Sequence, residues 1–230
     1  MRLDFYLSHA EGMSRKDAKL NITRGRIKIN STVVKKANTQ VKESDEVTLD
    51  GVTVGWPSER YYMLHKPVDY VCATQDDEHA TVLDLIPANL HKDLKVVGRL
   101  DIDTTGLLLL TTDGQWLHKI TSPKHECSKT YIVHLSTPIT TNAITELSNG
   151  VMLHGESAPT LPADVELISE RCIRLSIKEG KYHQVKRMLA AVGNHVDTLH
   201  RESIGSLSLG EELALGEFRT LTEGEINALS

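Results

Sequence analysis

The chain has 230 residues, of which 40% are hydrophobic and 25% are charged, and its formal net charge is -5 at pH 7. This composition is ordinary for a globular protein with one large domain or two smaller ones. It excludes a membrane helix, because no apolar run approaches the roughly 18 residues that a span needs, and the N-terminal stretch lacks the apolar core of a secretion signal. The three cysteines lie far apart and predict neither a disulfide framework nor a zinc site, so we expect a reducing cytoplasm around the protein.

The charge is unevenly distributed along the chain. Residues 1–42 contain ten Lys and Arg against three Asp and Glu, whereas the rest of the chain contains 16 against 28. A basic segment with a net charge of +7 beside an acidic body with a net charge of -12 is typical of a protein in which one module binds phosphate groups. The same charges are also compatible with a simple solvated surface, so charge alone leaves a nucleic-acid partner open.

The basic segment predicts two helices at its start. Apolar side chains recur at helical spacing in residues 3–10, and Gly12 is expected to end this first helix. Ser14 with Asp17 three residues later is typical of a capped helix start, which predicts a second, basic helix from there.

Short strands are expected after the second helix. Apolar and polar side chains alternate in residues 26–30, which predicts a half-buried strand with a turn near Asn30 and Ser31. Val47 and Leu49 predict one more strand.

Residues 1–50 resemble an S4 domain, a small RNA-binding module. The stretches RLDFYL, SRKDAK, ITRGRIKIN and VKESDEV carry the resemblance, and Ser31 stands where the family's hairpin usually has Gly. In S4 domains the basic second helix and the following strand grip RNA, and such residues neutralise phosphates rather than read sequence. The resemblance therefore implies that RNA is bound by Arg15, Lys16, Lys19, Arg24, Arg26 and Lys28.

The remainder of the chain reads as a linker followed by a larger body. Gly and Pro in residues 51–60 predict a linker. In residues 61–230 the stretches RYYML, LKVVG, LLLLTT, TYIVHL and CIRLSIK each predict a strand, and helices are expected near residues 142–147 and 184–192. This pattern predicts an α+β body with a mostly antiparallel or mixed β-sheet and flanking helices.

The stretch GRLDIDTTGLLLLTTDG, residues 98–114, places a polar patch between two apolar runs. Asp101 and Asp103 are two residues apart and would point to the same side of an extended chain. Such a pair is compatible with the two carboxylates of a glycosidase or with half of a metal site, although no nearby His or Glu completes one. A carboxylate that caps a turn through its side chain explains this motif at least as well.

Two further stretches contain residues that can carry chemistry. Tyr131 opens a strand in KTY, where it either packs in the sheet or presents an aromatic face to a base. In GKYHQVKRMLAAVGN the apolar residues form a helical stripe, with Lys186 on its flank and Arg187 nearly opposite. Such charges are usually solvated, but a flank lysine can reach a neighbouring site. We expect Arg187 to face outward and His183 to be structural.

Taken together and in this order, GRLDIDTTGLLLLTTDG, KTY, EGKYHQVKRM and LHRESIG resemble the RsuA-type branch of pseudouridine synthases over nearly the whole chain. MLHKPVDYVCAT fits the same branch, with His65, Val68 and Ala73 in place of commoner residues and Ala80 where Pro is usual. These enzymes combine an N-terminal S4 domain with a catalytic body and convert a uridine of ribosomal RNA into pseudouridine. Because the reaction is an isomerisation, the resemblance implies no cofactor and no metal.

The resemblance also implies roles for three residues. The essential aspartate of the family's GRLD sequence maps onto Asp101, which would act as nucleophile or base. The tyrosine of KTY maps onto Tyr131, which would stack on a uracil flipped out of its RNA. The basic residue after HQV maps onto Lys186, which would form an ion pair with Asp101.

Other residues of these motifs are expected to support the site. Asp103, Thr104 and Thr105 would shape the turn after Asp101. Arg99 and Arg187 join the expected RNA contacts.

The resemblance favours small-subunit (16S) ribosomal RNA, or an assembling small-subunit particle, as the partner of a monomeric enzyme. Large-subunit (23S) ribosomal RNA is the alternative within the class. A non-catalytic S4 ribosome-assembly factor and a glycoside hydrolase are the rivals from other classes. A hydrolase would need a sugar cleft rich in aromatic residues, whereas only 4% of this chain is Phe, Trp or Tyr.

Overall fold

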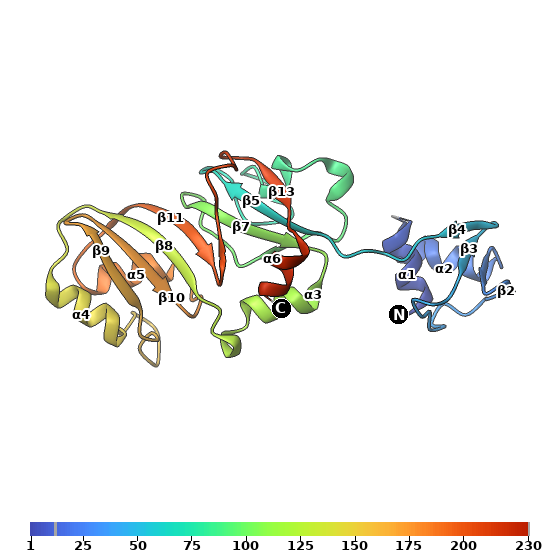
Figure 1. The fold of residues 1–230 in the computed structure, drawn as a ribbon, viewed down its shortest axis with the longest axis horizontal. Coiled ribbons are helices and arrows are strands. Elements are labelled where there is room, and N and C mark those ends of the chain that lie inside the picture. Colours follow the sequence, from blue (N-terminus) through green and yellow to red (C-terminus); the bar gives the residue numbers. More distant parts are fainter. Residues whose placement is uncertain (12, 230) are drawn as a thin grey trace. The chain divides into compact units, whose positions relative to one another are not determined.

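The computed structural model describes residues 1–11 and 13–229. Gly12, which is expected to end the first helix, lies outside the described residues. The chain divides into two compact units, Met1–Glu59 and Arg60–Ser230 (Figure 1). Within the described part of the chain, no helix has the length and apolar character that crossing a membrane requires.

The first unit packs two helices against a four-stranded antiparallel sheet (Figure 1). The strand order of this sheet is β2-β1-β3-β4. The second helix starts where the sequence predicts it, because the Ser14 side chain accepts a hydrogen bond from the backbone N–H of Asp17 at 3.1 Å. Asn30 and Ser31 adopt left-handed φ values of 47° and 68°, which closes a two-residue hairpin between β1 and β2. The elements are α1 (Leu3–Ala10), α2 (Arg15–Thr23), β1 (Ile27–Ile29), β2 (Thr32–Val33), β3 (Val47–Leu49) and β4 (Val52–Val54).

The prediction of a linker over residues 51–60 is wrong at its start, because β4 belongs to the first unit. Asp50 and Gly51 have φ values of 51° and 87° and form a two-residue hairpin turn that pairs β4 with β3. Val54 is buried, and its carbonyl accepts a hydrogen bond from the Tyr6 hydroxyl at 2.6 Å. The Asp-Gly pair is thus a hairpin signal and not the beginning of a linker.

In the second unit, nine of the described strands form one mixed sheet, which confirms the predicted α+β architecture. The main path of the sheet runs β13-β5-β7-β11-β8-β10-β9, while β6 pairs with β7 and β12 with β11. All of these pairs are antiparallel except β7 with β11, which is parallel. The strands are β5 (Tyr61–Lys66), β6 (Lys95–Val97), β7 (Thr105–Thr111), β8 (Lys129–Leu135), β9 (Asp164–Ser169), β10 (Cys172–Ile177), β11 (Val196–Ile204), β12 (Leu207–Ser208) and β13 (Phe218–Thr220).

Helices lie against this sheet, with α4 beside β9 (Figure 1). Helix α3 contacts β6. The two helices predicted for the body are confirmed as α4 and α5, whereas α3 and α6 were not predicted. Three short 3-10 turns cover residues 82–85, 88–90 and 123–125. The helices are α3 (Gly114–Thr121), α4 (Thr141–Asn149), α5 (Gln184–Ala191) and α6 (Glu223–Ala228).

Strand β7 explains the four consecutive leucines of the sequence motif. Leu107 and Leu109 enter one hydrophobic core cluster, while Leu108 and Leu110 enter the other, on the opposite face of the sheet. All four side chains are fully buried. A strand covered on both faces carries a continuous apolar run instead of an alternating one.

The polar patch of the same motif is the connection from β6 to β7, as the sequence predicts. At the start of β7, Gly106 has a φ of 117° and lies so close to β11 that an added Cβ would be 2.3 Å from the carbonyl oxygen of Arg201. Only glycine permits this approach, which allows the parallel pairing of β7 with β11. The pairing fixes the end of the connection next to the middle of the sheet.

Candidate active site

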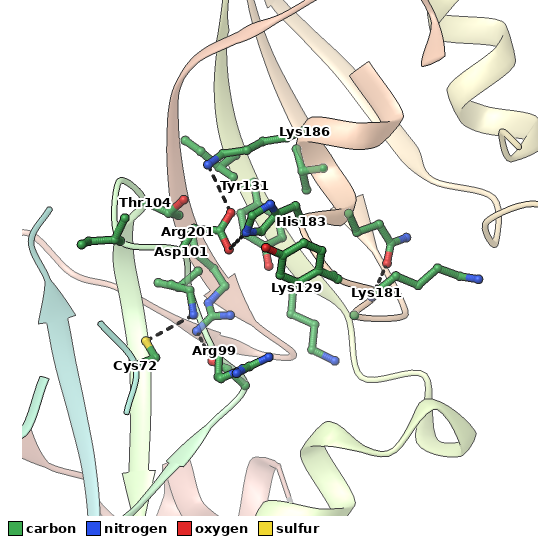
Figure 2. Close-up of a pocket in the computed structure, with 18 of the residues that line it drawn as sticks. Cys72, Arg99, Asp101, Thr104, Lys129, Tyr131, Lys181, His183, Lys186 and Arg201 are labelled. Atoms are coloured by element: carbon green, nitrogen blue, oxygen red, sulfur yellow. Dashed lines mark hydrogen bonds and ion pairs between the residues drawn. The ribbon is translucent and has the colours of Figure 1, made fainter. Parts of the chain in front are cut away.

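A pocket of about 500 Å³ opens beside the β6–β7 connection. Its walls are residues 98–102 of the connection, the start of β8, and residues 179–186, which end a loop and begin α5 (Figure 2). Segments distant in the sequence therefore meet in one cavity, whose size suits a small ligand or a single nucleobase.

Asp101 presents its carboxylate to a cation and an imidazole. Lys186 places its Nζ 3.2 Å from Oδ2 of Asp101, and His183 places its Nε2 3.4 Å from Oδ1. Figure 2 shows both side chains converging on this carboxylate. The Asp101 side chain is 25% exposed, so it is accessible from the pocket while its charge is only partly screened by water.

Asp103 is more than a turn former, which corrects the sequence expectation. Both of its carboxylate oxygens accept hydrogen bonds from Nζ of Lys186, at 2.6 and 2.9 Å. Partial burial raises the pKa of Asp103, but the Lys186 ammonium outweighs this effect and the net pKa is lowered. Burial likewise lowers the pKa of Lys186, and its bonds to Asp103 and Asp101 turn the net direction upward. The lysine therefore stays charged and is shared by two carboxylates.

His183 was expected to be structural, and the structure instead places it against Asp101. Its backbone adopts the left-handed conformation, with a φ of 45°, immediately before α5. Its ring stacks on Tyr182, with ring centroids 3.8 Å apart and an interplanar angle of 22°. A left-handed non-glycine residue of this kind leaves no periodic signal in a sequence, and so the pattern of the helix did not reveal the contact.

Two buried cations hold the backbone of the connection in place, and neither was singled out from the sequence. Lys66 is fully buried at the end of β5 and donates to the carbonyls of Asp101 at 3.0 Å and Thr104 at 2.8 Å. Burial lowers the pKa of Lys66. Arg201 of β11 is 2% exposed and donates to the carbonyls of Leu107 and Gly98 at 2.8 and 3.0 Å. These carbonyls compensate the cost of burying the two charges and fix where Asp101 points.

Tyr131 lies on β8 at the wall of the pocket, opposite Arg201 in the sheet register. It is 8% exposed and packs in the larger core cluster of the body. Its ring is therefore held rigidly, with a small surface left toward the cavity. A rigid aromatic in this position can contact the face of a bound base.

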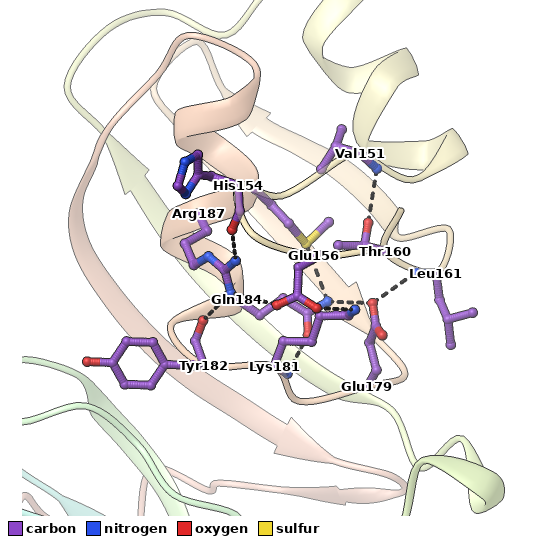
Figure 3. Close-up of polar contacts among 11 residues, drawn as sticks. Val151, His154, Glu156, Thr160, Leu161, Glu179, Lys181, Tyr182, Gln184 and Arg187 are labelled. Atoms are coloured by element: carbon purple, nitrogen blue, oxygen red, sulfur yellow. Dashed lines mark hydrogen bonds and ion pairs between the residues drawn. The ribbon is translucent and has the colours of Figure 1, made fainter. Parts of the chain in front are cut away.

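Arg187 does not face outward, which corrects the prediction for this residue. It donates to the carbonyls of His154 at 2.7 Å and Tyr182 at 3.1 Å, and its Nη1 lies 3.2 Å from Oε1 of Glu156 (Figure 3). The segment after α4 supplies the acceptors of His154 and Glu156, and the loop before α5 supplies the Tyr182 carbonyl. Helical periodicity marks Arg187 as opposite the apolar stripe, but it does not predict a loop that covers that side.

The expected RNA-binding residues differ in how they are engaged. Arg2 and then Arg15 hydrogen-bond to the buried Asp4 and, against the effect of burial, lower its pKa to about 2. Arg26 pairs with Asp50. The other members of the expected RNA-binding set, Arg187 apart, are exposed; they are Lys16, Lys19, Arg24 and Lys28 in the first unit and Arg99 at the pocket.

The arrangement supports acid–base or nucleophilic chemistry by a single carboxylate. Within the described residues, no group of three or more His, Cys, Asp and Glu side chains is placed to hold a metal ion. Asp101 has the Lys186 ammonium beside it and a cavity in front of it, and a carboxylate in this setting can attack an electrophilic carbon or remove a proton.

Known proteins match this chain over nearly its whole length. The model of the RNA pseudouridylate synthase family matches residues 60–191, and the S4 domain model matches residues 1–47. The ribosomal small subunit pseudouridine synthase A of Escherichia coli K12 is 47% identical over 98% of both chains. That of Haemophilus influenzae is 44% identical over 100% of this chain and 99% of its own. A solved pseudouridylate synthase structure aligns over 100% of both chains with a TM-score of 0.73 and 43% identity.

Proposed function

The chain belongs to the RNA pseudouridylate synthase family, and we propose that it converts one uridine of small-subunit (16S) ribosomal RNA into pseudouridine. Support for this substrate comes from the relatives matched end to end at 44% and 47% identity, both named for the ribosomal small subunit. We further propose that the protein acts as a monomer, either on naked RNA or on an assembling particle.

One observation carries the assignment of the reacting group. The Asp101 carboxylate lies between the Lys186 ammonium and the His183 imidazole, in a pocket that Tyr131 also lines. Asp103 makes a shorter contact with the same lysine, but it is 65% exposed, whereas Asp101 is 25% exposed. We assign the chemistry to Asp101 because, of the two carboxylates that contact Lys186, it is the one that lines the cavity.

The reaction breaks the bond between N1 of uracil and C1′ of ribose, turns the base, and joins C5 to C1′. The C5 proton is lost to water, and N1 takes up a proton, so the product is an isomer of the substrate. A stacked base is inaccessible, so the uridine must first be flipped out of the RNA into the pocket. Tyr131 would hold the flipped base, and Asp101 would act as a nucleophile on the sugar or base, or as a base that abstracts the 2′ proton. Lys186, whose ammonium lies 3.2 Å from this carboxylate, would hold it in position.

In this proposal the first unit supplies affinity for RNA. Its exposed lysines and arginines, on α2 and β1, would neutralise phosphates without reading sequence. The unit would thereby keep the RNA near the pocket.

The test is release of tritium from RNA labelled at C5 of uracil. Purified small-subunit ribosomal RNA and its particles are incubated with the wild type, with Asp101→Asn, and with Asp103→Asn as the matched control. We expect release by the wild type, a loss of at least about 10³-fold in Asp101→Asn, and less than about tenfold loss in Asp103→Asn. RNA affinity of Asp101→Asn should stay within a few-fold of the wild type.

The other outcomes separate the alternatives. Release from large-subunit RNA alone would keep the reaction and change the substrate. Absence of release from both RNAs would favour a non-catalytic S4 protein. Turnover by Asp101→Asn close to that of the wild type would refute the assignment of the carboxylate.

A further inference from the structure

Tyr182 is a large aromatic side chain that stays exposed at the edge of the pocket. It is 69% exposed, although it is one of the residues that line the cavity. Its ring stacks on His183 at a centroid distance of 3.8 Å, and most of its remaining surface is accessible to solvent. The chemistry assigned to the pocket does not use this ring.

The backbone that carries the ring is held by hydrogen bonds. The Tyr182 carbonyl accepts a hydrogen bond from Arg187, and the amide of Lys181 donates to the Gln184 side chain at 2.8 Å. The carbonyl of His183 accepts a hydrogen bond from the amide of Arg187 at 3.0 Å. Figure 3 shows the Tyr182 ring directed away from this polar cluster. A left-handed residue such as His183 persists only where its surroundings over-determine it, so the exposed ring is presented on a rigid support.

The stacked rings of Tyr182 and His183 also connect the edge of the pocket with Asp101. His183 lies between the two, with Nε2 3.4 Å from Oδ1 of Asp101 and one ring face covered by Tyr182. A uridine flipped toward Asp101 leaves its neighbours in the strand without a stacking partner. Exposed Arg99, on another wall of the same pocket, adds positive charge for the backbone of that strand.

We propose that Tyr182 is a stacking platform for an unpaired nucleobase next to the flipped uridine, so that Tyr182 and His183 extend the base stack to the pocket. The ligand is RNA, and in this respect the inference rests on the proposed function. Stacking on an aromatic ring tolerates any base, so Tyr182 would hold the strand in place and would not read its sequence. Holding the strand in advance lowers the entropic cost of placing the uridine at Asp101.

A simpler role for Tyr182 would be to shield the His183 ring from solvent, which any large apolar side chain at this position could do. Three substitutions distinguish the two roles. Tyr182→Phe keeps the aromatic face, Tyr182→Leu keeps an apolar cover without a π-face, and Tyr182→Ala removes both. Leu167→Ala is the matched control, because Leu167 is 55% exposed on the same unit and does not line the pocket.

The experiment measures the Kd for small-subunit ribosomal RNA in an Asp101→Asn background, in which we expect turnover to be lost. It also measures KM and kcat by tritium release in the otherwise wild-type chain. We expect Tyr182→Ala and Tyr182→Leu to raise Kd and KM about tenfold, with kcat within about threefold. Tyr182→Phe and Leu167→Ala should stay within about twofold. Thermal unfolding checks that each variant is folded.

The outcomes are decisive in both directions. The inference is overturned if Tyr182→Leu binds like the wild type, since an apolar cover would then suffice, or if Tyr182→Ala binds within twofold. The Kd series needs no turnover, so absence of tritium release would refute the proposed function while the binding data still decide the role of Tyr182.

Discussion

Replacing Lys186 by Met removes the cation beside Asp101 and keeps most of the apolar stem. In the structure the Lys186 ammonium lies 3.2 Å from Asp101 and 2.6 Å from Asp103. Without it, Asp101 and Asp103 would lose the ammonium that both carboxylates contact. We expect the Asp101 carboxylate to be held less well in its pocket-facing position.

The size of the effect follows from the distance and the exposure. Two unit charges 3.2 Å apart attract each other by about 1.3 kcal/mol in water and by about 5 kcal/mol at an effective dielectric constant near 20. The side chains of Lys186 and Asp101 are 28% and 25% exposed, and Asp103 shares the cation, so an intermediate value applies. A loss of about 2–3 kcal/mol corresponds to about a 30- to 150-fold lower kcat.

The assay is multiple-turnover tritium release at saturating small-subunit ribosomal RNA, which gives kcat. Lys181→Met is the matched control, because Lys181 lines the same pocket but pairs with Glu156 at 2.9 Å. We expect Lys181→Met to retain kcat within about threefold. The reasoning is refuted if Lys186→Met also stays within threefold, or if the two lysine variants lose the same amount of kcat.

Three further predictions concern binding and stability. Replacing both Lys16 and Lys19 by Gln should weaken RNA binding. The slope of log Kd against log salt should fall by about 0.7–0.9 for each phosphate that is no longer neutralised. An unchanged slope in salt titrations would exclude these two residues as phosphate ligands. Asp4, whose pKa is lowered to about 2 from an ordinary 3.8, should contribute about 2 kcal/mol to the first unit above pH 4, about half of that at pH 3, and nothing once the pH falls below its folded-state pKa. Amide hydrogen exchange of α1 in the full chain should therefore show a difference between Asp4→Asn and wild type that shrinks with acid, and a constant difference would contradict the cause. Gly106→Ala should destabilise the second unit by about 3 kcal/mol or more in thermal unfolding, because the added Cβ would overlap β11. The control Gly155→Ala, with φ of 80° and no neighbour within 4 Å, should cost only about 1 kcal/mol. Equal losses of stability in the two variants would rule out the overlap.

The sequence by itself determined most local elements and the position of the polar connection. Helical spacing and a capping serine located the first helices, and the Asn30–Ser31 turn was correctly predicted without glycine. The four leucines of β7 predicted a buried strand, because an apolar run without alternation must be covered on both faces. The motifs around Asp101, Tyr131 and Lys186 indicated the family before any contact was known.

The tertiary structure decided which charged groups meet. Periodicity describes the buried side of one element, but the partner of a charge is supplied by a segment far away in the sequence. Lys66 is buried because carbonyls of a connection 35 to 38 residues away surround its ammonium. Arg187 turns inward because a loop covers its helix, and His183 reaches Asp101 because a left-handed backbone turns it there. These positions depend on the folding of separate segments around a common pocket, and no local pattern in the chain encodes that arrangement.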